Sequence, residues 1–166
     1  RYPWHGRVRI SVEPRQPAEF AVCVRIPGWA RNRPVPSDLY RFLEAHPGEP
    51  SLSVNGRPAA IELEKGYVRL KRRWEKGDTV ELELPMPVRR VLAHEEVTFD
   101  RGKVALQRGP MVYCLEGADN DGRVLNLLLP DDAELTTETR SDLLGGVVTL
   151  VGQGRSAERT LDDRVV

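Results

Sequence analysis

Apolar and polar residues alternate with a period of two along much of this chain. The segments RVRISVE (7–13), FAVCVRI (20–26) and TVELEL (79–84) each place their apolar side chains on one face and their polar side chains on the other. This alternation is typical of antiparallel strands with one buried and one solvated face. We therefore expect a β protein with a core between layers of sheet.

Turn residues separate these strands. Asn55-Gly56 tolerates the positive φ that both central residues of a type I′ turn require, and so predicts a tight hairpin. The segments EKGY (64–67) and EKGD (75–78) each contain a glycine that can close a further turn. Pro85 and Pro87 cannot donate to a sheet ladder, so we expect an edge, a bulge or a crossing between sheets there.

One segment departs from the period of two. In residues 34–50, Leu39, Phe42 and Leu43 recur at helical spacing, Ser37 is a plausible N-cap, and Pro47-Gly48 would end a helix. The pattern predicts one short helix within a long loop, packed against the rim of the sheets.

After residue 92 a second set of strand patterns begins. We expect strands in KVALQ (103–107) and MVYCL (111–115), a strand buried on both faces in VLNLLLP (124–130), and a strand in 143–151 with Gly145-Gly146 as a bend or bulge. The predicted fold class is all-β: an antiparallel, jelly-roll-like β-sandwich over residues 1–92, followed by a second β-sandwich unit over 93–166 that lacks its last strands.

Composition narrows the functional classes. The 166 residues include 25 Lys and Arg against 25 Asp and Glu, so the chain has no bulk attraction for nucleic acid or an anionic membrane. No apolar run approaches the roughly 20 residues of a membrane-spanning helix. The chain begins without Met or a hydrophobic leader, and we expect both ends to continue in a longer protein.

Cys114 and Glu116 are the first candidates for catalysis, because a thiol beside a carboxylate can form a nucleophile with an acid/base partner. A reactive thiolate requires a cation, a helix N-terminus or a metal to lower its pKa, and no histidine is close in sequence. We therefore expect Cys114 to be a packing residue in a strand. Cys23 and Cys114 are expected to be reduced and buried, since free cysteines are among the most buried residues.

The other polar candidates have structural explanations. Glycosidases need two carboxylates at a defined separation, but the acidic residues here mostly alternate with apolar ones and are expected on solvated faces: Glu62, Glu64, Glu81, Glu83, Asp131 and Asp132. His5, His46 and His94 lack metal-ligand spacing. The segment ADNDGR (118–123) is interpreted as a turn rather than a calcium loop. We expect no catalytic, cofactor-binding or metal-ligating residue.

Aromatic residues are the remaining candidates for binding. Carbohydrate-binding sandwiches present flat rings to sugar faces, and the residues expected to contact either a sugar or a neighbouring domain are Trp4, Trp29, Trp74 and Tyr67. The basic residues of KRR (71–73) and Arg89-Arg90 are expected on a solvated face or in salt bridges to another domain.

Five segments occur together in an order that resembles a known family. They are YPWHGRVRISVEP (2–14), VRIPGWA (24–30), VNGRPA (54–59), EKGYVRLKRRWEKGDTVELELPMPVRRV (64–91) and DRGKVALQRGPMVYCLEG (100–117). Over residues 2–151 the chain resembles the non-catalytic β-sandwich region of glycoside hydrolase family 127, the β-L-arabinofuranosidase-like family. The similarity is most specific over residues 99–116.

The resemblance implies that this chain is part of a larger enzyme. Family members combine an (α/α)6 barrel, in which a zinc-bound cysteine thiolate and glutamates perform catalysis, with β-sandwich domains. None of those catalytic residues corresponds to a position here, so zinc is expected only in a catalytic domain outside this chain. The resemblance implies an accessory structural module of a glycoside hydrolase acting on arabinose-containing glycans, inactive alone, whose partner is the barrel of its own protein.

An alternative function is a carbohydrate-binding module that stacks sugars on exposed Trp or Tyr rings. In that case a glycan would be the partner, with neither nucleic acid nor membrane involved.

Overall fold

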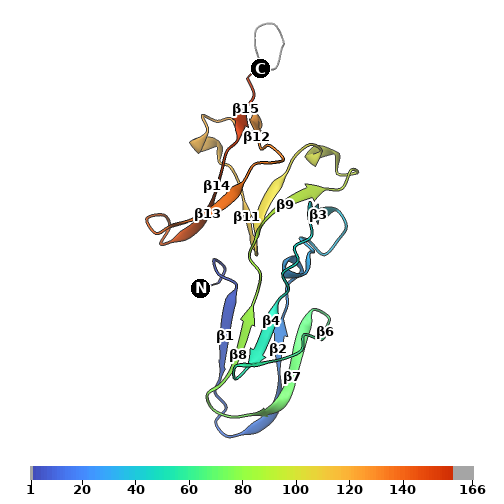
Figure 1. Cartoon of the computed structure of the whole chain (residues 1–166), viewed down its shortest axis with the longest axis vertical. Coiled ribbons are helices and arrows are strands. Elements are labelled where there is room, and N and C mark those ends of the chain that lie inside the picture. Colours follow the sequence, from blue (N-terminus) through green and yellow to red (C-terminus); the bar gives the residue numbers. More distant parts are fainter. Residues whose placement is uncertain (1, 159–166) are drawn as a thin grey trace. The chain divides into compact units, whose positions relative to one another are not determined.

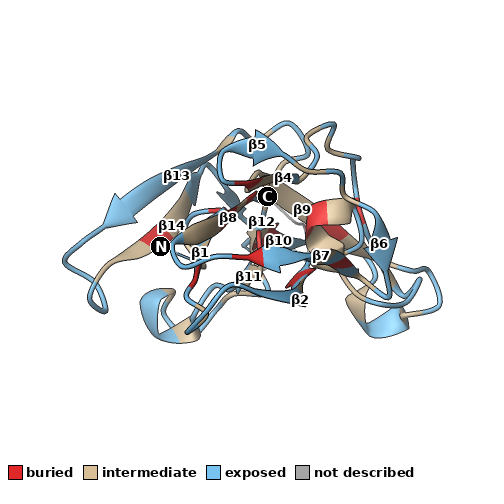
Figure 2. Cartoon of the chain, turned by 90° about the horizontal axis from the view of Figure 1, so that it is seen from below, coloured by how far each residue is buried: buried red, intermediate tan, exposed pale blue. Residues whose placement is uncertain are grey.

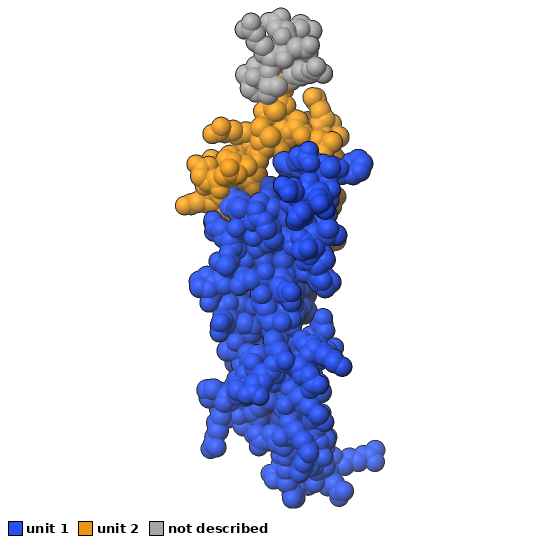
Figure 3. All heavy atoms as spheres, turned by 90° about the vertical axis from the view of Figure 1, so that its right-hand side faces the viewer, with its two compact units in different colours: residues 1–112 blue, residues 113–166 orange. Residues whose placement is uncertain are grey.

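The computed structural model describes residues 2–158 and is built almost entirely of antiparallel strands (Figure 1). The chain divides into two compact units, Arg1–Val112 and Tyr113–Val166, which Figure 3 shows in different colours. The all-β fold class expected from the sequence is confirmed. The domain division expected at residues 92 and 93 stays a prediction.

The first unit contains a sandwich of two sheets. One sheet has the order β1-β8-β4-β5 and the other the order β2-β7-β6. The bounds of these strands are β1 Arg7–Val12, β2 Ala18–Arg25, β4 Ser51–Val54, β5 Arg57–Pro58, β6 Leu63–Glu64, β7 Tyr67–Trp74 and β8 Asp78–Glu83. The three strands expected from alternation are all present, and Figure 2 shows their buried positions in red.

The core of this sandwich consists of inward residues from both sheets, including Val24 and Val68 on one side and Val80 and Leu82 on the other. In the first sheet Ile10 pairs with Val80, and in the second Val24 pairs with Val68. The alternation fixes this register, because a slip of one residue would expose every apolar side chain.

Two tight hairpins form where the sequence predicts them. Asn55 and Gly56 have φ values of 52° and 73° and connect β4 to β5. Lys65 and Gly66 have φ values of 52° and 85° and connect β6 to β7. Both central residues of each turn are therefore in the left-handed region, as a type I′ turn requires.

A third sheet has the order β11-β10-β9-β3, and three of its strands, β9, β10 and β11, follow the two prolines. Its strands are β3 Tyr40–Phe42, β9 Val88–Ala93, β10 Ala105–Arg108 and β11 Met111–Tyr113. Pro85 and Pro87 lie in the connection from β8 to β9, so this segment is the crossing between sheets that was one of the expected alternatives.

The prediction of a short helix within residues 34–50 is wrong. Residues 40–42 form strand β3, in which Tyr40 pairs with Ala93 and Phe42 pairs with Val91. Phe42 is buried, but Leu39 and Leu43 are exposed. A single helical turn closes few hydrogen bonds for the residues it orders, whereas the edge of β9 pairs this segment directly. Short helical elements near this segment are the 3-10 turns η1 (Gly28–Arg31) and η2 (Thr98–Asp100), and the Tyr40 hydroxyl donates a 2.8 Å hydrogen bond to the Asp100 carboxylate.

The second unit is a smaller β structure. Strand β13 (Leu135–Arg140) pairs with β14 (Val147–Gly152), and β12 (Leu127–Leu128) pairs with β15 (Arg155–Ser156). Gly145 and Gly146, both at positive φ, lie in the turn before β14. The Tyr113 hydroxyl donates a 3.0 Å hydrogen bond to the carbonyl oxygen of Val148, which is buried.

The prediction of a strand buried on both faces at residues 124–130 is wrong. Only Leu127 and Leu128 are in a strand, and Leu125 is 87% exposed. A continuous apolar run shows no period that would identify a covered face, and small units bury a smaller share of their surface. Among residues 2–158, no helix is long and apolar enough to cross a membrane.

Candidate functional sites

The two cysteines do not occupy the positions expected from the frequency of buried cysteine. Both are free, and both are exposed, so the prediction of burial is wrong. Cys23 lies on the outward face of β2, opposite Arg69 of β7. Cys114 follows the last residue of β11, next to the exposed Leu115. In FAVCVRI, Cys23 lies between Val22 and Val24, which pack toward the core, so the strand alternation turns its side chain outward whatever its residue type.

The acidic residues lie mainly on solvated surfaces. The Glu81 carboxylate is 3.3 Å from the Arg7 guanidinium and 3.8 Å from that of Arg9, all on the outer face of the first sheet. Exposed pairs of this kind contribute little to stability. Within the described residues, no group of three His, Cys, Asp or Glu side chains is arranged to hold a metal ion. Residues 118–123 form a turn in which the Asn120 amide donates to the Glu116 carbonyl oxygen at 2.8 Å.

The four aromatic candidates differ in exposure. Trp74 is 0% exposed, and its indole N–H donates a 3.0 Å hydrogen bond to the carbonyl oxygen of Phe20. Trp29 is half-buried against the sandwich core, and Trp4 is also half-buried. Tyr67 is 40% exposed on the outer face of β7. The structure thus places Trp74 in the core, while Tyr67 has the most accessible ring of the four.

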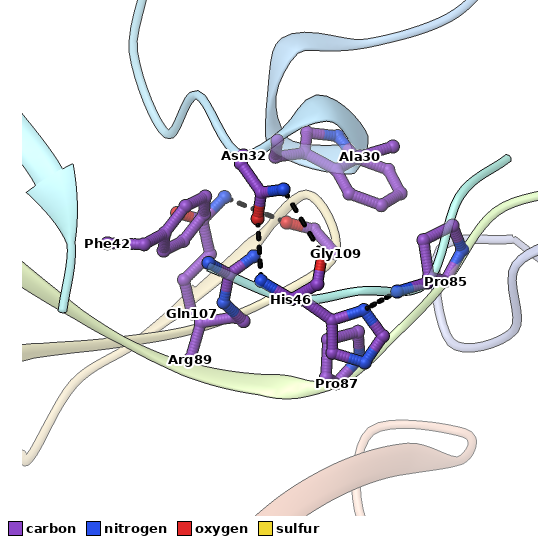
Figure 4. A pocket seen from close by; sticks show the side chains of 11 residues that line it. Ala30, Asn32, Phe42, His46, Pro85, Pro87, Arg89, Gln107 and Gly109 are labelled. Carbon is purple, nitrogen blue, oxygen red and sulfur yellow. Dashed lines mark hydrogen bonds between the residues drawn. The ribbon is translucent and has the colours of Figure 1, made fainter. Parts of the chain in front are cut away.

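A small cavity lies among loops of the first unit (Figure 4). Its volume is about 10 Å³, which is near the minimum for a single water molecule. The residues around it come from η1, β3, β9, β10 and the loops beside them, and include Asn32, Phe42, Arg89 and Gln107. The cavity is far too small for a sugar.

The polar groups around this cavity mainly connect the loops to one another. The Asn32 amide donates to the His46 carbonyl oxygen at 3.2 Å and accepts from the His46 backbone N–H at 2.9 Å. Gln107, which is buried, donates to the Gly109 carbonyl oxygen at 2.8 Å. Figure 4 shows these bonds as dashed lines. These hydrogen bonds satisfy backbone groups of the loops and hold the loops together. We call the set of Asn32, His46, Gln107 and Gly109 the junction.

Arg89 completes the junction. Its guanidinium lies 3.7 Å from the centroid of the Phe42 ring and donates to the carbonyl oxygen of Glu44. Burial lowers the pKa of Arg89 below its ordinary value, and the Glu44 carboxylate partly opposes this effect. The guanidinium therefore fixes the 42–44 segment against β9.

Arginine side chains also meet at the turn between β6 and β7. Arg25 ends β2, and its guanidinium lies 5.3 Å from the centroid of the Tyr67 ring. Arg31 ends η1, and its buried Nε atom has no hydrogen-bond partner among the described residues. A backbone hydrogen bond of 2.9 Å from Ile26 to Gly66 joins these segments. Sequence reasoning missed Arg31, because only the fold brings η1 beside this turn.

The sandwich and the third sheet, together with the smaller second unit, make this chain an all-β segment. Comparisons with known proteins identify its family. Residues 1–86 match the model of the β-L-arabinofuranosidase GH127 middle domain, and residues 88–160 match that of the glycoside hydrolase family 127 C-terminal domain. This chain therefore belongs to glycoside hydrolase family 127, as the resemblance implied.

Individual relatives agree with this assignment. The chain is 40% identical over 157 residues to a non-reducing end β-L-arabinofuranosidase of Bifidobacterium longum subsp. longum, covering 90% of this chain and 21% of that protein. A solved GH127 β-arabinofuranosidase matches with a TM-score of 0.86 and 34% identity, over 99% of this chain and 26% of the other.

A second solved structure, a GH127 β-L-arabinofuranosidase from Geobacillus stearothermophilus T6, matches with a TM-score of 0.79 and 40% identity. That match covers 99% of this chain and 24% of the other. The chain thus spans about a fifth to a quarter of the length of these relatives.

Proposed function

We propose that this chain is an accessory structural module of a β-L-arabinofuranosidase-like glycoside hydrolase that acts on arabinose-containing glycans. The observation that carries the proposal is the ordered match to a middle and a C-terminal domain, in relatives of which about three-quarters lie outside the match. The catalytic groups belong to that larger part, and the partner of this chain is the catalytic domain of its own protein.

The internal junction supports a structural role. Asn32, His46 and Gln107 bond to backbone groups of loops, and Arg89 binds the 42–44 segment. Polar side chains that are already committed to internal partners hold loops in position and are unsuited to acid/base exchange with a substrate. The module contributes a rigid support, while zinc and its thiolate ligands belong to the catalytic domain.

Deletion in the full-length protein tests this role. Removing residues 1–158 should reduce the yield and thermal stability of the folded catalytic domain, because its surface against the module would become exposed. Circular dichroism and thermal unfolding measure this effect, with hydrolysis of an aryl β-L-arabinofuranoside as the functional readout. A truncated protein without residues 1–158 that keeps the stability and turnover of the full-length enzyme would contradict a structural supporting role.

Tyr67 favours a second candidate function, carbohydrate binding. Its ring is 40% exposed, and the Arg25 guanidinium lies near it and can donate hydrogen bonds. Isothermal titration calorimetry with arabino-oligosaccharides tests this function. Saturable binding that Tyr67→Ala abolishes, and that Trp4→Ala leaves unchanged, would support sugar stacking at Tyr67. If the titration shows no heat of binding, carbohydrate binding is rejected and the structural role remains the proposed function.

A further inference from the structure

The guanidinium groups of Arg25 and Arg31 converge on Gly66 from two different segments. A terminal nitrogen of each lies 3.9 Å from the point where a Cβ atom on Gly66 would be. The two nitrogens are therefore within twice that distance of each other. Because Gly66 has no side chain, the space between them stays open.

These two positive charges have no counterion in the described chain. Within residues 2–158, neither guanidinium forms an ion pair with a carboxylate, and the Nε atom of Arg31 is buried without a partner. Glu64, the neighbouring carboxylate in the register, lies on the far side of Tyr67 from Arg25. Two adjacent like charges are unfavourable alone, and one carboxylate between the two terminal nitrogens would relieve their repulsion.

We propose that Arg25 and Arg31 form a docking site for a carboxylate on the surface of the catalytic domain of the same protein. This proposal rests on the proposed function and adds the surface through which the module is attached. Arginine binds carboxylates through two parallel hydrogen bonds, and Arg and Tyr are enriched at protein interfaces. Tyr67, exposed beside the pair, supplies the aromatic part of such a contact.

The surroundings favour a single protein carboxylate over a polyanionic glycan. A polyanion would bind along the exposed cations on the outer face of β7, where Lys71 is already 3.3 Å from the Glu19 carboxylate but Arg69 and Arg73 form no ion pair within residues 2–158. The pair at Gly66 differs from this row because both guanidiniums converge on one point. Arg31 is half-buried where η1 lies beside the turn between β6 and β7, and this burial restricts the positions that its guanidinium can take. One half-buried and one exposed guanidinium that converge on a single point match one carboxylate in one geometry.

Zero-length cross-linking in the full-length enzyme tests the docking site. A carbodiimide joins an amine to a carboxylate in direct contact but does not couple a guanidinium, so Arg25→Lys and Arg31→Lys each introduce a reactive amine. We expect mass spectrometry to find the introduced amine joined to an Asp or Glu of the catalytic domain. The matched control is Arg57→Lys, on exposed β5 of the other sheet, which should give no such product.

Coupling only to Glu64, no coupling at all, or the same products from Arg57→Lys would overturn the proposal. A second variant, Arg25→Met with Arg31→Met, keeps the side-chain stems and removes both charges. Protease should then release the module from the full-length enzyme on the order of tenfold faster than from wild type, as for a tenfold shift in the docking equilibrium. An unchanged release rate would contradict the docking site.

Two further outcomes separate this proposal from its alternatives. Retardation of the wild type by alginate in native gels, lost in the double Met variant and without interdomain cross-links, would assign the pair to a carboxylated glycan and overturn the protein partner. Activity of the full-length enzyme on an aryl β-L-arabinofuranoside tests the proposed function separately. An active enzyme that needs the module but shows no coupling would refute only the docking site.

Discussion

At the residue scale, strand β7 shows how one strand divides its side chains between core and surface. Trp74 and Tyr67 are seven positions apart, so they point to opposite faces of the sheet. Trp74 is completely buried and hydrogen-bonded to Phe20, whereas Tyr67 is 40% exposed beside Arg25. Two aromatic residues of one strand therefore have different roles, one in stability and one at a surface.

Truncating these two side chains should have unequal effects. Trp74→Ala removes a fully buried ring and its hydrogen bond and should lower the free energy of unfolding by about 3–5 kcal/mol. Tyr67→Ala, the matched control on the same strand, should cost less than about 1 kcal/mol, because much of its ring is already in water. Urea unfolding of both variants measures the difference, and equal losses would mean that Trp74 is not the centre of the core.

The two thiols should be accessible without unfolding. Cys23 and Cys114 are both exposed, so a thiol reagent should label both in the native protein at rates close to those of the denatured chain. Mass spectrometry after a timed reaction with iodoacetamide measures this. Labelling that requires denaturant would show that the cysteines are buried, as their residue type alone suggested.

At the scale of elements, the turns carry strict backbone requirements. Gly56 has φ of 73° and nothing near its missing Cβ atom, so Gly56→Ala adds strain without a steric clash. We expect a loss of about 1 kcal/mol in the free energy of unfolding. Gly117→Ala is the control, because Gly117 is not at positive φ and its nearest contact would be 3.7 Å away. Thermal unfolding compares the two, and equal stability would argue against the type I′ turn.

The turn after β13 contains an ion pair that can be titrated. Asp142 accepts hydrogen bonds from Arg140 at 2.8 and 3.0 Å, and mainly for this reason its pKa falls from 3.8 to about 2. Because the folded pKa is the lower one, the stabilisation is present above pH 3.8 and is lost as the pH falls through about 2. NMR titration should report this pKa, and Arg140→Gln should raise it toward 3.8. An unchanged pKa in that variant would exclude the pair.

Much of the element structure was predictable because strands and tight turns depend on local patterns. The alternation around Val24 and Val80 and the Asn55-Gly56 pair specify strands and a hairpin without reference to distant residues. Phe42 shows the limit, since its segment became a strand only because the edge of β9 was available for pairing. No pattern in the sequence reports a free edge.

The sites were harder to predict because they depend on convergence in space. Gln107 sits in a strand that alternation identifies, but its bond to Gly109 and its burial depend on the surrounding loops. Arg31 meets Arg25 only because η1 lies beside the turn at Gly66. Neither spacing nor composition contains that information.

At the scale of the whole molecule, the family identification and the fold lead to one claim. The chain is composed of the middle and C-terminal domains of a glycoside hydrolase family 127 protein and spans about a fifth to a quarter of its relatives. We propose that it supports a catalytic domain and that Arg25 and Arg31 dock it there. Catalysis itself is assigned to the remainder of the protein.

The most direct test compares turnover by the isolated chain and by the full-length protein. Both are purified and assayed on an aryl β-L-arabinofuranoside with zinc present, at equal molar concentration. We predict hydrolysis by the full-length protein and a rate for the isolated chain equal to that of buffer. Turnover by the isolated chain that survives repeated purification would contradict the account.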